Sequence, residues 1–313
     1  PYDIDFRVGR FTVDFEDDYG LYTDNDAVFG DFRTDGFRLK KQWGALSATA
    51  IIGRNDNSAQ ADYNYNWTSN KSTEDRNGED YMSYILDLHY QPNEKLFLGA
   101  TGYYFDNDKD NVTDKGVQTY DFYAGYNFTP AIALKGIYYI QKLDDNVGVG
   151  YYGLRANSAA VEDSPNAWKV VLDVKQEALK FTSLWVEYSQ QDNSFQGIND
   201  RYSIGGNKYD YVGRNLVFAD MNNSSKFWFV KADQKWNDKW SSFVRFANVD
   251  YDTDNLDNAT EWGLGVGYQY TPALYFELAY DQVDHGDNNG LSANEDVARG
   301  KDHVVRFRTT VNF

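Results

Sequence analysis

The C-terminal stretch 302–313 alternates apolar and polar side chains and ends on an aromatic residue. Its odd positions include Val305 and Phe307, whereas its even positions include Arg306 and Arg308. Successive side chains of a β-strand point to opposite faces of a sheet. One face of this predicted strand is therefore apolar and the other is charged.

The same alternation recurs along the whole chain and predicts fourteen strands. Short turns alternate with long polar loops between these predicted strands. Transmembrane β-barrels have apolar outward and polar inward positions, short periplasmic turns and longer extracellular loops. The sequence therefore predicts an all-β, antiparallel, up-and-down transmembrane barrel that spans residues 1–313 as a single domain. The alternative is a large soluble β-sandwich.

Charge and composition favour the membrane barrel. The net charge of −18 lies entirely in the predicted long loops, because acidic and basic residues balance in the strands and turns. Aromatic residues make up 17% of the chain and gather near the predicted strand ends, as the interfacial girdles of membrane barrels do. The sequence lacks an apolar run long enough for a transmembrane helix. We expect the protein to lie in the outer membrane of a diderm, Gram-negative-type bacterium.

The start of the chain suggests processing. It begins at Pro1 without an initiator methionine or a signal peptide, so we expect a processed chain or part of a longer protein. The absence of cysteine excludes a disulfide scaffold, a thiol nucleophile and thiolate metal sites.

The residue types and spacings that enzymes and metal sites need are missing. His89, His285 and His303 lie far apart and lack metal-ligand spacing, so we predict no catalytic residue, no metal and no cofactor. A hydrolase that uses Ser83 and His89 is a less favoured alternative. The glycines at 263, 265 and 267 fall inside a strand and indicate strand packing rather than a phosphate-binding loop.

Two acidic triplets in the predicted loops resemble the start of a calcium-binding loop. They begin at Asp106 and Asp250, but they lack the glycine and the final glutamate of such loops. A solvated acidic loop is the favoured interpretation, and divalent-cation bridges to lipopolysaccharide phosphates are the alternative.

Charged residues on the inward parity form the candidate functional constellation. The predicted pore-lining basic residues are Arg7, Arg10, Arg38, Lys40, Lys135, Lys169, Lys175, Lys231, Lys235, Arg245, Arg306 and Arg308. The predicted pore-lining acids are Asp5, Asp87, Asp121, Asp173, Glu187, Asp233, Glu261, Glu277 and Asp281. Unpaired buried ions cost several kcal/mol, so this many charges predicts a water-filled lumen.

Basic residues concentrate on the first two strands and the last one. If the first and last strands pair, Arg306 and Arg308 lie beside Arg7 and Arg10 and form a basic wall. The alternative is salt bridging from wall to wall, in which Glu277 and Asp281 neutralise the arginines. A basic wall that faces an acidic inward loop would form a transverse field, as in a selectivity filter. The candidate inward loops are residues 16–34 and residues 55–79.

A general diffusion porin for small hydrophilic solutes and ions is the first functional hypothesis, and the expectation is that the protein is not an enzyme. A channel selective for sugars or anions is the second; it would use inward aromatic side chains as stacking surfaces. These are Tyr103, Tyr123, Tyr139, Phe227 and Phe229. A tether or surface-binding barrel without a channel is the third hypothesis.

Several pieces of the chain resemble outer-membrane porins. They are the segment 6–11 (Phe-Arg-Val-Gly-Arg-Phe), the segment 24–29 that leads into Asp-Gly-Phe at 35–37, the repeated Thr-Pro turns and the terminal Val-Asn-Phe. The chain most resembles the S-layer-homology-domain porins (OmpM-type) of diderm Firmicutes, of which it would hold the barrel part. This resemblance implies a homotrimer and sixteen strands, with two strands upstream of Pro1 or two strands merged.

The resemblance also implies partners. An S-layer homology domain and a stalk bind peptidoglycan in those porins, and neither segment is in this chain, so peptidoglycan is expected only through a domain absent here. Outer-membrane lipid and lipopolysaccharide are the other expected partners, and no nucleic acid is expected.

Overall fold

The computed structural model of the chain describes residues 4–16, 19–22, 32–55, 81–107, 117–143, 164–192, 195, 224–252, 258–284 and 301–312. These residues form fourteen strands and one short helix. The first seven strands are β1 (Ile4–Thr12), β2 (Arg33–Trp43), β3 (Leu46–Asn55), β4 (Tyr81–Tyr90), β5 (Leu96–Asn107), β6 (Val117–Thr129) and β7 (Ile132–Leu143). The others are β8 (Asn166–Val174), β9 (Leu184–Gln191), β10 (Ser225–Lys235), β11 (Trp240–Tyr251), β12 (Ala259–Thr271), β13 (Leu274–Asp284) and β14 (Lys301–Val311).

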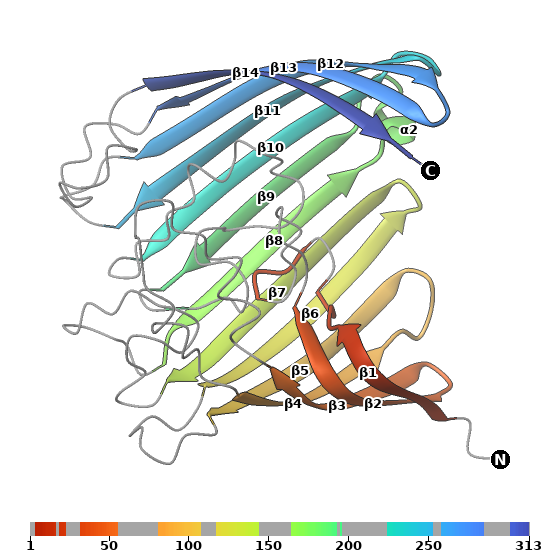
Figure 1. Cartoon of the computed structure of the whole chain (residues 1–313), viewed down its shortest axis with the longest axis vertical. Helices are drawn as coiled ribbons and strands as arrows, with labels where there is room; N and C mark the ends of the chain where they lie inside the picture. The colour runs from red at the N-terminus through yellow and green to blue at the C-terminus, as the bar shows by residue number, and fades with distance from the viewer. Residues whose placement is uncertain are drawn as a thin grey trace, which may run out of the picture.

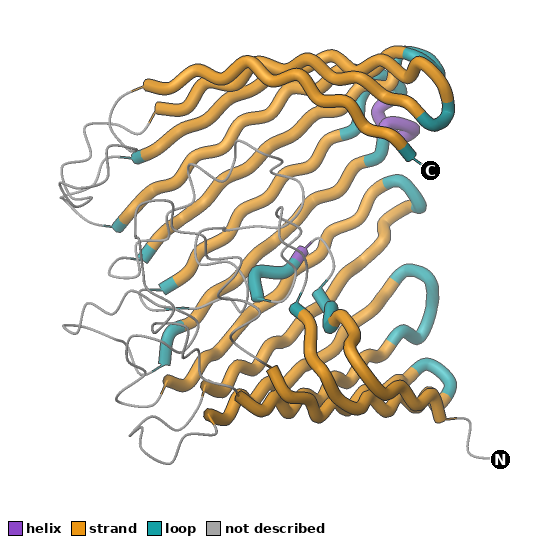
Figure 2. The backbone as a smooth tube through the Cα atoms, viewed as in Figure 1, coloured by secondary structure: helices purple, strands orange, loops and turns teal. Residues whose placement is uncertain are grey.

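All fourteen strands belong to one antiparallel sheet in which each strand pairs with its neighbours in the sequence. This up-and-down order confirms the predicted all-β architecture and the predicted number of strands. The sheet curls around an interior, and the short turns gather at one end while the strands lead into the loops at the other (Figure 1). The helix α2 (Gln176–Leu179) lies in one of the short connections (Figure 2). No helix in the described part of the chain is both long and apolar enough to cross a membrane.

The pairing of neighbouring strands stops at β1 and β14. Among the described residues no backbone pairing joins these two strands. In the view of Figure 1 they lie on opposite sides of the curl, at the bottom and at the top. The predicted pairing of the first and last strands is therefore not formed by the described residues.

The outer face of the sheet is apolar because the alternating pattern places the large hydrophobic side chains there. Phe6 is 56% exposed, Phe37 is 55% exposed and Phe307 is 67% exposed. Burying these side chains in a protein core would stabilise a soluble fold, so their exposure along a whole sheet face fits contact with lipid. Near the loop end, the rings of Trp168, Tyr188 and Trp228 pack against one another in tilted pairs across three strands, with centroid separations of 5.0 and 4.4 Å.

The apolar residues of the first strand change parity between Val8 and Phe11, which predicts a β-bulge at Gly9 and Arg10, and this prediction is wrong. Strand β1 keeps a one-to-one register with β2 from Ile4 to Thr12. Gly9 adopts a φ of 112°, which glycine tolerates because it has no Cβ. The strand therefore continues through Gly9 without an extra residue. The parity does not change, so Phe11 points inward and is 3% exposed.

Candidate functional site

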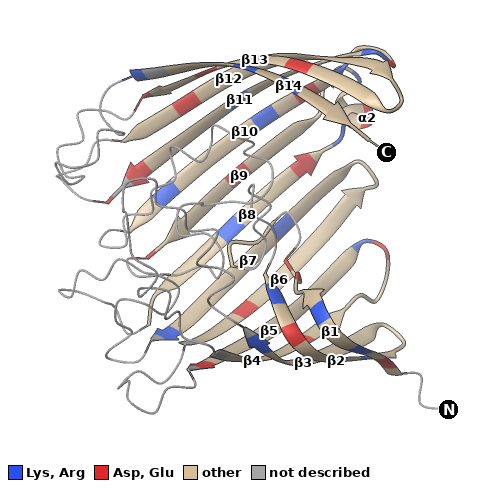
Figure 3. Ribbon diagram, in the orientation of Figure 1, with Lys and Arg blue, Asp and Glu red and all other residues tan. Residues whose placement is uncertain are grey.

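The inner face of the curled sheet carries most of the charged side chains that the sequence singled out, spaced along the strands (Figure 3). The basic residues there are Arg7, Arg38, Lys40, Lys135, Lys169, Lys231, Lys235, Arg245, Arg306 and Arg308. The acids there are Asp5, Asp87, Asp121, Asp173, Glu187, Asp233, Glu261, Glu277 and Asp281.

Two of the predicted pore-lining residues lie elsewhere. Arg10 projects from the outer face, where it forms a bidentate ion pair with Asp35 at 2.9 and 2.6 Å. The physical reason is the unbroken register of β1, which leaves Arg10 on the same face as Val8. Lys175 lies one residue beyond β8, as the exposed N-cap residue of α2, so the strand alternation no longer sets its direction.

The loop half of the interior is packed with aromatic side chains. Tyr103, Phe105, Tyr139, Phe227 and Phe229 are at most 1% exposed. Four of these five were predicted to be inward stacking surfaces. Their burial corrects the expectation that the whole lumen is filled with water.

A segment that follows β1 accounts for this packing. Residues 13–16 and 19–22, here called the inner segment, lie within the curl of the sheet (Figure 2). Tyr19 and Tyr22 are 5% and 2% exposed, and the ring of Tyr22 lies 5.0 Å from the ring of Tyr103. Of the two predicted inward loops, residues 16–34 therefore contribute Glu16 and residues 19–22 of the inner segment, whereas residues 56–79 lie outside the described part.

A single carboxylate anchors the inner segment. Glu16 is fully buried, and its Oε2 accepts hydrogen bonds from the Leu21 and Tyr22 backbone amides at 3.1 and 2.9 Å. The Tyr139 hydroxyl of β7 donates to the same oxygen at 2.8 Å and accepts from the Leu21 amide at 2.8 Å. These bonds close a turn of the segment on itself and attach it to the barrel wall.

A buried lysine adds a second attachment. Lys169 of β8 donates from Nζ to the Gly20 carbonyl at 3.2 Å and pairs with Glu187 Oε1 at 3.2 Å. Both charged side chains are 0% exposed. Lys135 of β7 lies 5.4 Å from the centre of the Tyr19 ring, in a cation–π geometry.

The inner charges on the C-terminal strands are paired. Arg245 lies 2.7 Å from Asp281 and 3.4 Å from Glu261, and all three side chains are at most 2% exposed. Arg306 lies 3.1 Å from Glu277. Salt bridging across the wall, one of the two alternatives in the sequence analysis, is therefore the arrangement on these strands.

The predicted basic wall is not assembled by the described residues. Arg306 and Arg308 lie on β14, Arg7 lies on β1, and these strands do not pair. Arg10 points outward, and Arg38 forms an ion pair with Asp5 at 2.9 Å.

Glycines on the inner face make room for these contacts. Gly263 lies opposite Arg245 on one side and Asp281 on the other, and a Cβ at Gly263 would overlap Asp281 Oδ1. The Phe243 ring lies against Gly265 in the same way. The sequence interpretation of these glycines as strand packing is confirmed, because they let side chains of β11 and β13 meet across β12.

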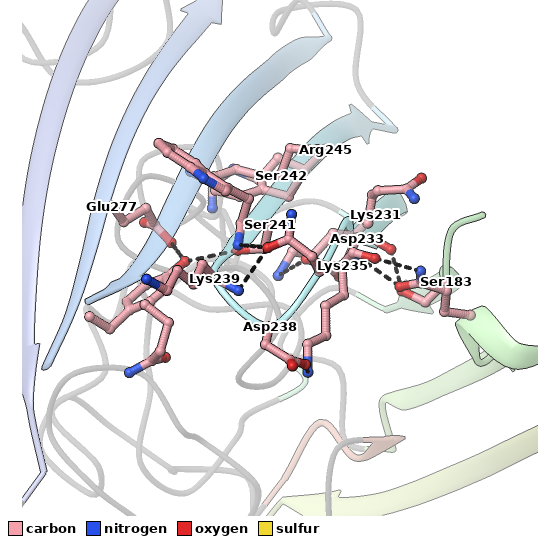
Figure 4. Close-up of a pocket in the computed structure, with 17 residues that line it drawn as sticks. Ser183, Lys231, Asp233, Lys235, Asp238, Lys239, Ser241, Ser242, Arg245 and Glu277 are labelled. Atoms are coloured by element: carbon pink, nitrogen blue, oxygen red, sulfur yellow. Dashed lines mark hydrogen bonds and ion pairs between the residues drawn. The ribbon is translucent and has the colours of Figure 1, made fainter. Parts of the chain in front are cut away.

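The turn half of the interior is more open than the loop half. A pocket of about 580 Å³ lies on the inner side of β10 to β13 near the turns (Figure 4). Lys231, Asp233 and Ser241 line it, and Lys231 pairs with Asp233 at 3.2 Å. This half therefore presents partly exposed charged side chains to the interior, as the sequence predicted for the whole lumen.

The contact between Glu16 and Tyr139 was not predicted from the sequence. Glu16 was one of several acids in a polar loop, and Tyr139 was assigned a stacking role. Their contact joins residues 123 positions apart, so no local pattern indicates it. The available signal was the alternation of apolar residues at positions 11, 13 and 15. Without a bulge, this alternation places their side chains on the inner face of the sheet.

Comparison with solved structures identifies the fold. OccK10 (OpdN) of Pseudomonas aeruginosa is 16% identical, with a TM-score of 0.57 over 100% of this chain and 82% of that one. OccAB1 of Acinetobacter baumannii is 14% identical, with a TM-score of 0.57 over 99% of this chain and 74% of that one. The outer membrane protein OprD of Pseudomonas aeruginosa is 12% identical, with a TM-score of 0.55 over 98% of this chain and 74% of that one.

No protein-family model and no curated protein matches the chain. One of these neighbours, OprD, is named as an outer membrane protein, in agreement with the location predicted here. At these identities the likeness shows the architecture, and the chain has the β-barrel fold of outer-membrane porins.

Proposed function

We propose that this chain forms an outer-membrane channel that passes small hydrophilic solutes selectively, with its constriction at the inner segment. No covalent chemistry is involved, and the protein is not an enzyme. The observation that carries the proposal is the attachment of the inner segment to the barrel wall through Glu16, Tyr139 and Lys169.

Selective passage is favoured over general diffusion because the inner segment occupies the loop half of the interior. Aromatic packing around Tyr22 and Tyr103 leaves less room there than an empty barrel of many strands would have. General diffusion was the first hypothesis from the sequence, since the inward charges predicted a water-filled lumen. The charged turn half still supports hydrophilic rather than apolar solutes.

Planar-bilayer recording of the purified protein tests this function. We expect small single-channel conductance steps that particular solutes, such as sugars or organic anions, reduce in a saturable way. A large, ohmic conductance that no solute blocks would support general diffusion instead. The complete absence of conductance would reject the channel and leave a tether or surface-binding role.

The assembly of the protein is also a proposal. The resemblance to S-layer-homology-domain porins suggests a homotrimer and an attachment to peptidoglycan through a separate domain. Native mass spectrometry in detergent tests the trimer directly, and a monomer as the only species would reject it.

A further inference from the structure

Three rings on neighbouring strands form a group at the border between the packed interior and the open turn half. They belong to His89 of β4, Phe97 of β5 and Tyr123 of β6, here called the ring shelf. The centre of the His89 ring lies 5.9 Å from the centres of the Phe97 and Tyr123 rings, with interplanar angles of 21° and 26°. The imidazole is therefore nearly parallel to each of the other two rings.

Two glycines let these rings lie close against the barrel wall. A Cβ at Gly99, which lies between His89 and Tyr123 in the register, would overlap the Tyr123 ring. A Cβ at Gly125, which lies opposite Phe97, would overlap the Phe97 ring. Because these wall positions lack side chains, the Phe97 and Tyr123 rings rest directly on the backbone of the sheet.

The ring shelf adjoins the inner segment and is open toward the turns. The ring of Tyr19, in the inner segment, lies 5.9 Å from the Phe97 ring and 6.4 Å from the Tyr123 ring. His89 and Phe97 are nevertheless only half-buried, whereas Tyr103, further toward the loops, is 1% exposed. A solute in the turn half can therefore reach the His89 and Phe97 rings beside the constriction.

A chain of hydrogen bonds determines which nitrogen of His89 is available to a solute. The Tyr123 hydroxyl donates to Asp87 Oδ1 at 2.8 Å, so its proton is not available to His89. The Nδ1 atom of His89 lies 3.1 Å from the same hydroxyl oxygen and must therefore donate to it. In the neutral imidazole the other nitrogen, Nε2, is then a hydrogen-bond acceptor. Among the described residues Nε2 has no hydrogen-bond partner.

The polar side chains beside His89 on the inner face are uncharged. Ser47 of β3 lies directly opposite His89, and Gln42 of β2 lies directly opposite Ser47. Gln42 is exposed and Ser47 is half-buried, so a solute in the turn half can reach both. Small-molecule sites commonly combine aromatic surface with a few placed polar groups, and the shelf with its neighbours has this composition.

Two cations near the shelf interact with other groups. Lys40 of β2 interacts electrostatically with Asp87. Lys135 of β7 lies opposite Gly125, and its ammonium group is 5.4 Å from the centre of the Tyr19 ring. The shelf itself therefore offers a ring face and a neutral acceptor rather than a positive charge.

We propose that the ring shelf binds pyranose sugars, with one face of the sugar ring on Phe97 and a sugar hydroxyl donating to His89 Nε2. The carbon-bound hydrogens on the face of a pyranose carry partial positive charge, which the electron-rich face of an aromatic ring attracts. A carboxylate has no proton to donate to Nε2, so the shelf favours hydroxyl-bearing solutes over anions. The inference rests on the proposed selective channel and names its solute class.

Ligand-observed NMR titration of the full chain tests the proposal, in a detergent that has no sugar head group. Maltose is the sugar, sorbitol is an open-chain polyol without a ring face, and benzoate is a flat anion. We expect maltose to bind about tenfold more tightly than sorbitol or benzoate, because only maltose offers both a ring face and hydroxyl donors. Magnetisation should pass from the protein mainly to the carbon-bound hydrogens on one sugar face.

Two variants remove the two parts of the shelf separately. His89→Phe keeps a ring but removes the Nε2 acceptor, and should weaken maltose binding about tenfold. Phe97→Leu keeps an apolar side chain but removes the ring face, and should weaken maltose binding about fivefold. Phe128→Leu is the matched control, because Phe128 is 52% exposed on the outer face of the sheet, and it should bind maltose as the wild type does.

Equal binding of maltose and sorbitol by the wild type would overturn the proposal, and this comparison does not depend on the folding of any variant. Tighter binding of benzoate than of maltose would overturn it as well. Maltose binding that neither His89→Phe nor Phe97→Leu weakens would place the sugar away from the shelf. A channel that conducts ions but binds no maltose rejects this inference alone, whereas the absence of conductance rejects the proposed function.

Discussion

The substitution Gly263→Ala should break a buried ion pair without changing any charged residue. Gly263 lies on the inner face of β12, directly between Arg245 on β11 and Asp281 on β13. The guanidinium and the carboxylate meet over this glycine at 2.7 Å. A Cβ at position 263 would overlap Asp281 Oδ1 and lie 3.1 Å from Arg245 Nε, so the pair must separate.

The burial of the pair sets the size of the effect. The Arg245 and Asp281 side chains are 2% and 0% exposed, so water cannot replace the lost partner. Breaking a buried ion pair costs about 3–5 kcal/mol. We expect the lower end, about 3 kcal/mol of unfolding free energy, because Glu261 remains within 3.4 Å of Arg245 and Arg306 within 3.9 Å of Asp281.

The assay is denaturant unfolding of the protein refolded into lipid vesicles. Gly102→Ala is the matched control, because a Cβ there meets only the Tyr120 ring, at 3.6 Å, and should change stability by less than about 0.5 kcal/mol. In an Asp281→Ala background, Gly263→Ala should cost less than about 1 kcal/mol, since the pair is already gone. An equal cost of Gly263→Ala in both backgrounds would refute the reasoning.

Three further predictions concern the interior. Tyr139→Phe removes the hydroxyl that joins the inner segment to β7, so single-channel conductance should rise and fluctuate more in bilayer recordings. Lys169→Met leaves Glu187 buried without its ion-pair partner and should lower the unfolding free energy by about 3–5 kcal/mol in the vesicle assay. Ser241→Cys would be the only cysteine of the chain, and its modification by a charged thiol reagent should reduce conductance, because Ser241 lines the pocket in the turn half.

Each of these three predictions has a control variant and an outcome that would contradict it. Tyr138→Phe makes the same chemical change on the outer face, and equal conductance changes in the two tyrosine variants would contradict the anchoring role. Lys169→Met combined with Glu187→Leu should recover most of the lost stability, and no recovery would argue against the ion pair as the cause. Unchanged conductance after complete modification of Ser241→Cys would place the pocket outside the conduction path.

The architecture of the sheet could be predicted because it depends on local pattern. Alternation with a period of two fixes which side chains meet lipid, and Phe307 and Arg308 fall on opposite faces without reference to any other strand. Prolines and polar residues mark the turns, so the number and order of the strands follow from the sequence. The error at Gly9 arose because a glycine permits a bulge without requiring one, and the consequence was the wrong face for Arg10.

The contents of the interior could not be predicted in the same way. Glu16 and Tyr139 meet across 123 positions, and the Arg245–Asp281 pair exists because two registers align both residues with Gly263. Such contacts depend on the curvature of the whole sheet and on the position of a loop inside it. Neither the curvature nor the loop position produces a periodic pattern in the sequence. The sequence by itself therefore determined the lipid-facing wall, because each strand meets lipid independently of the others. Only the tertiary structure decided how the interior is filled, because the partners of inner side chains lie on strands that are distant in the sequence.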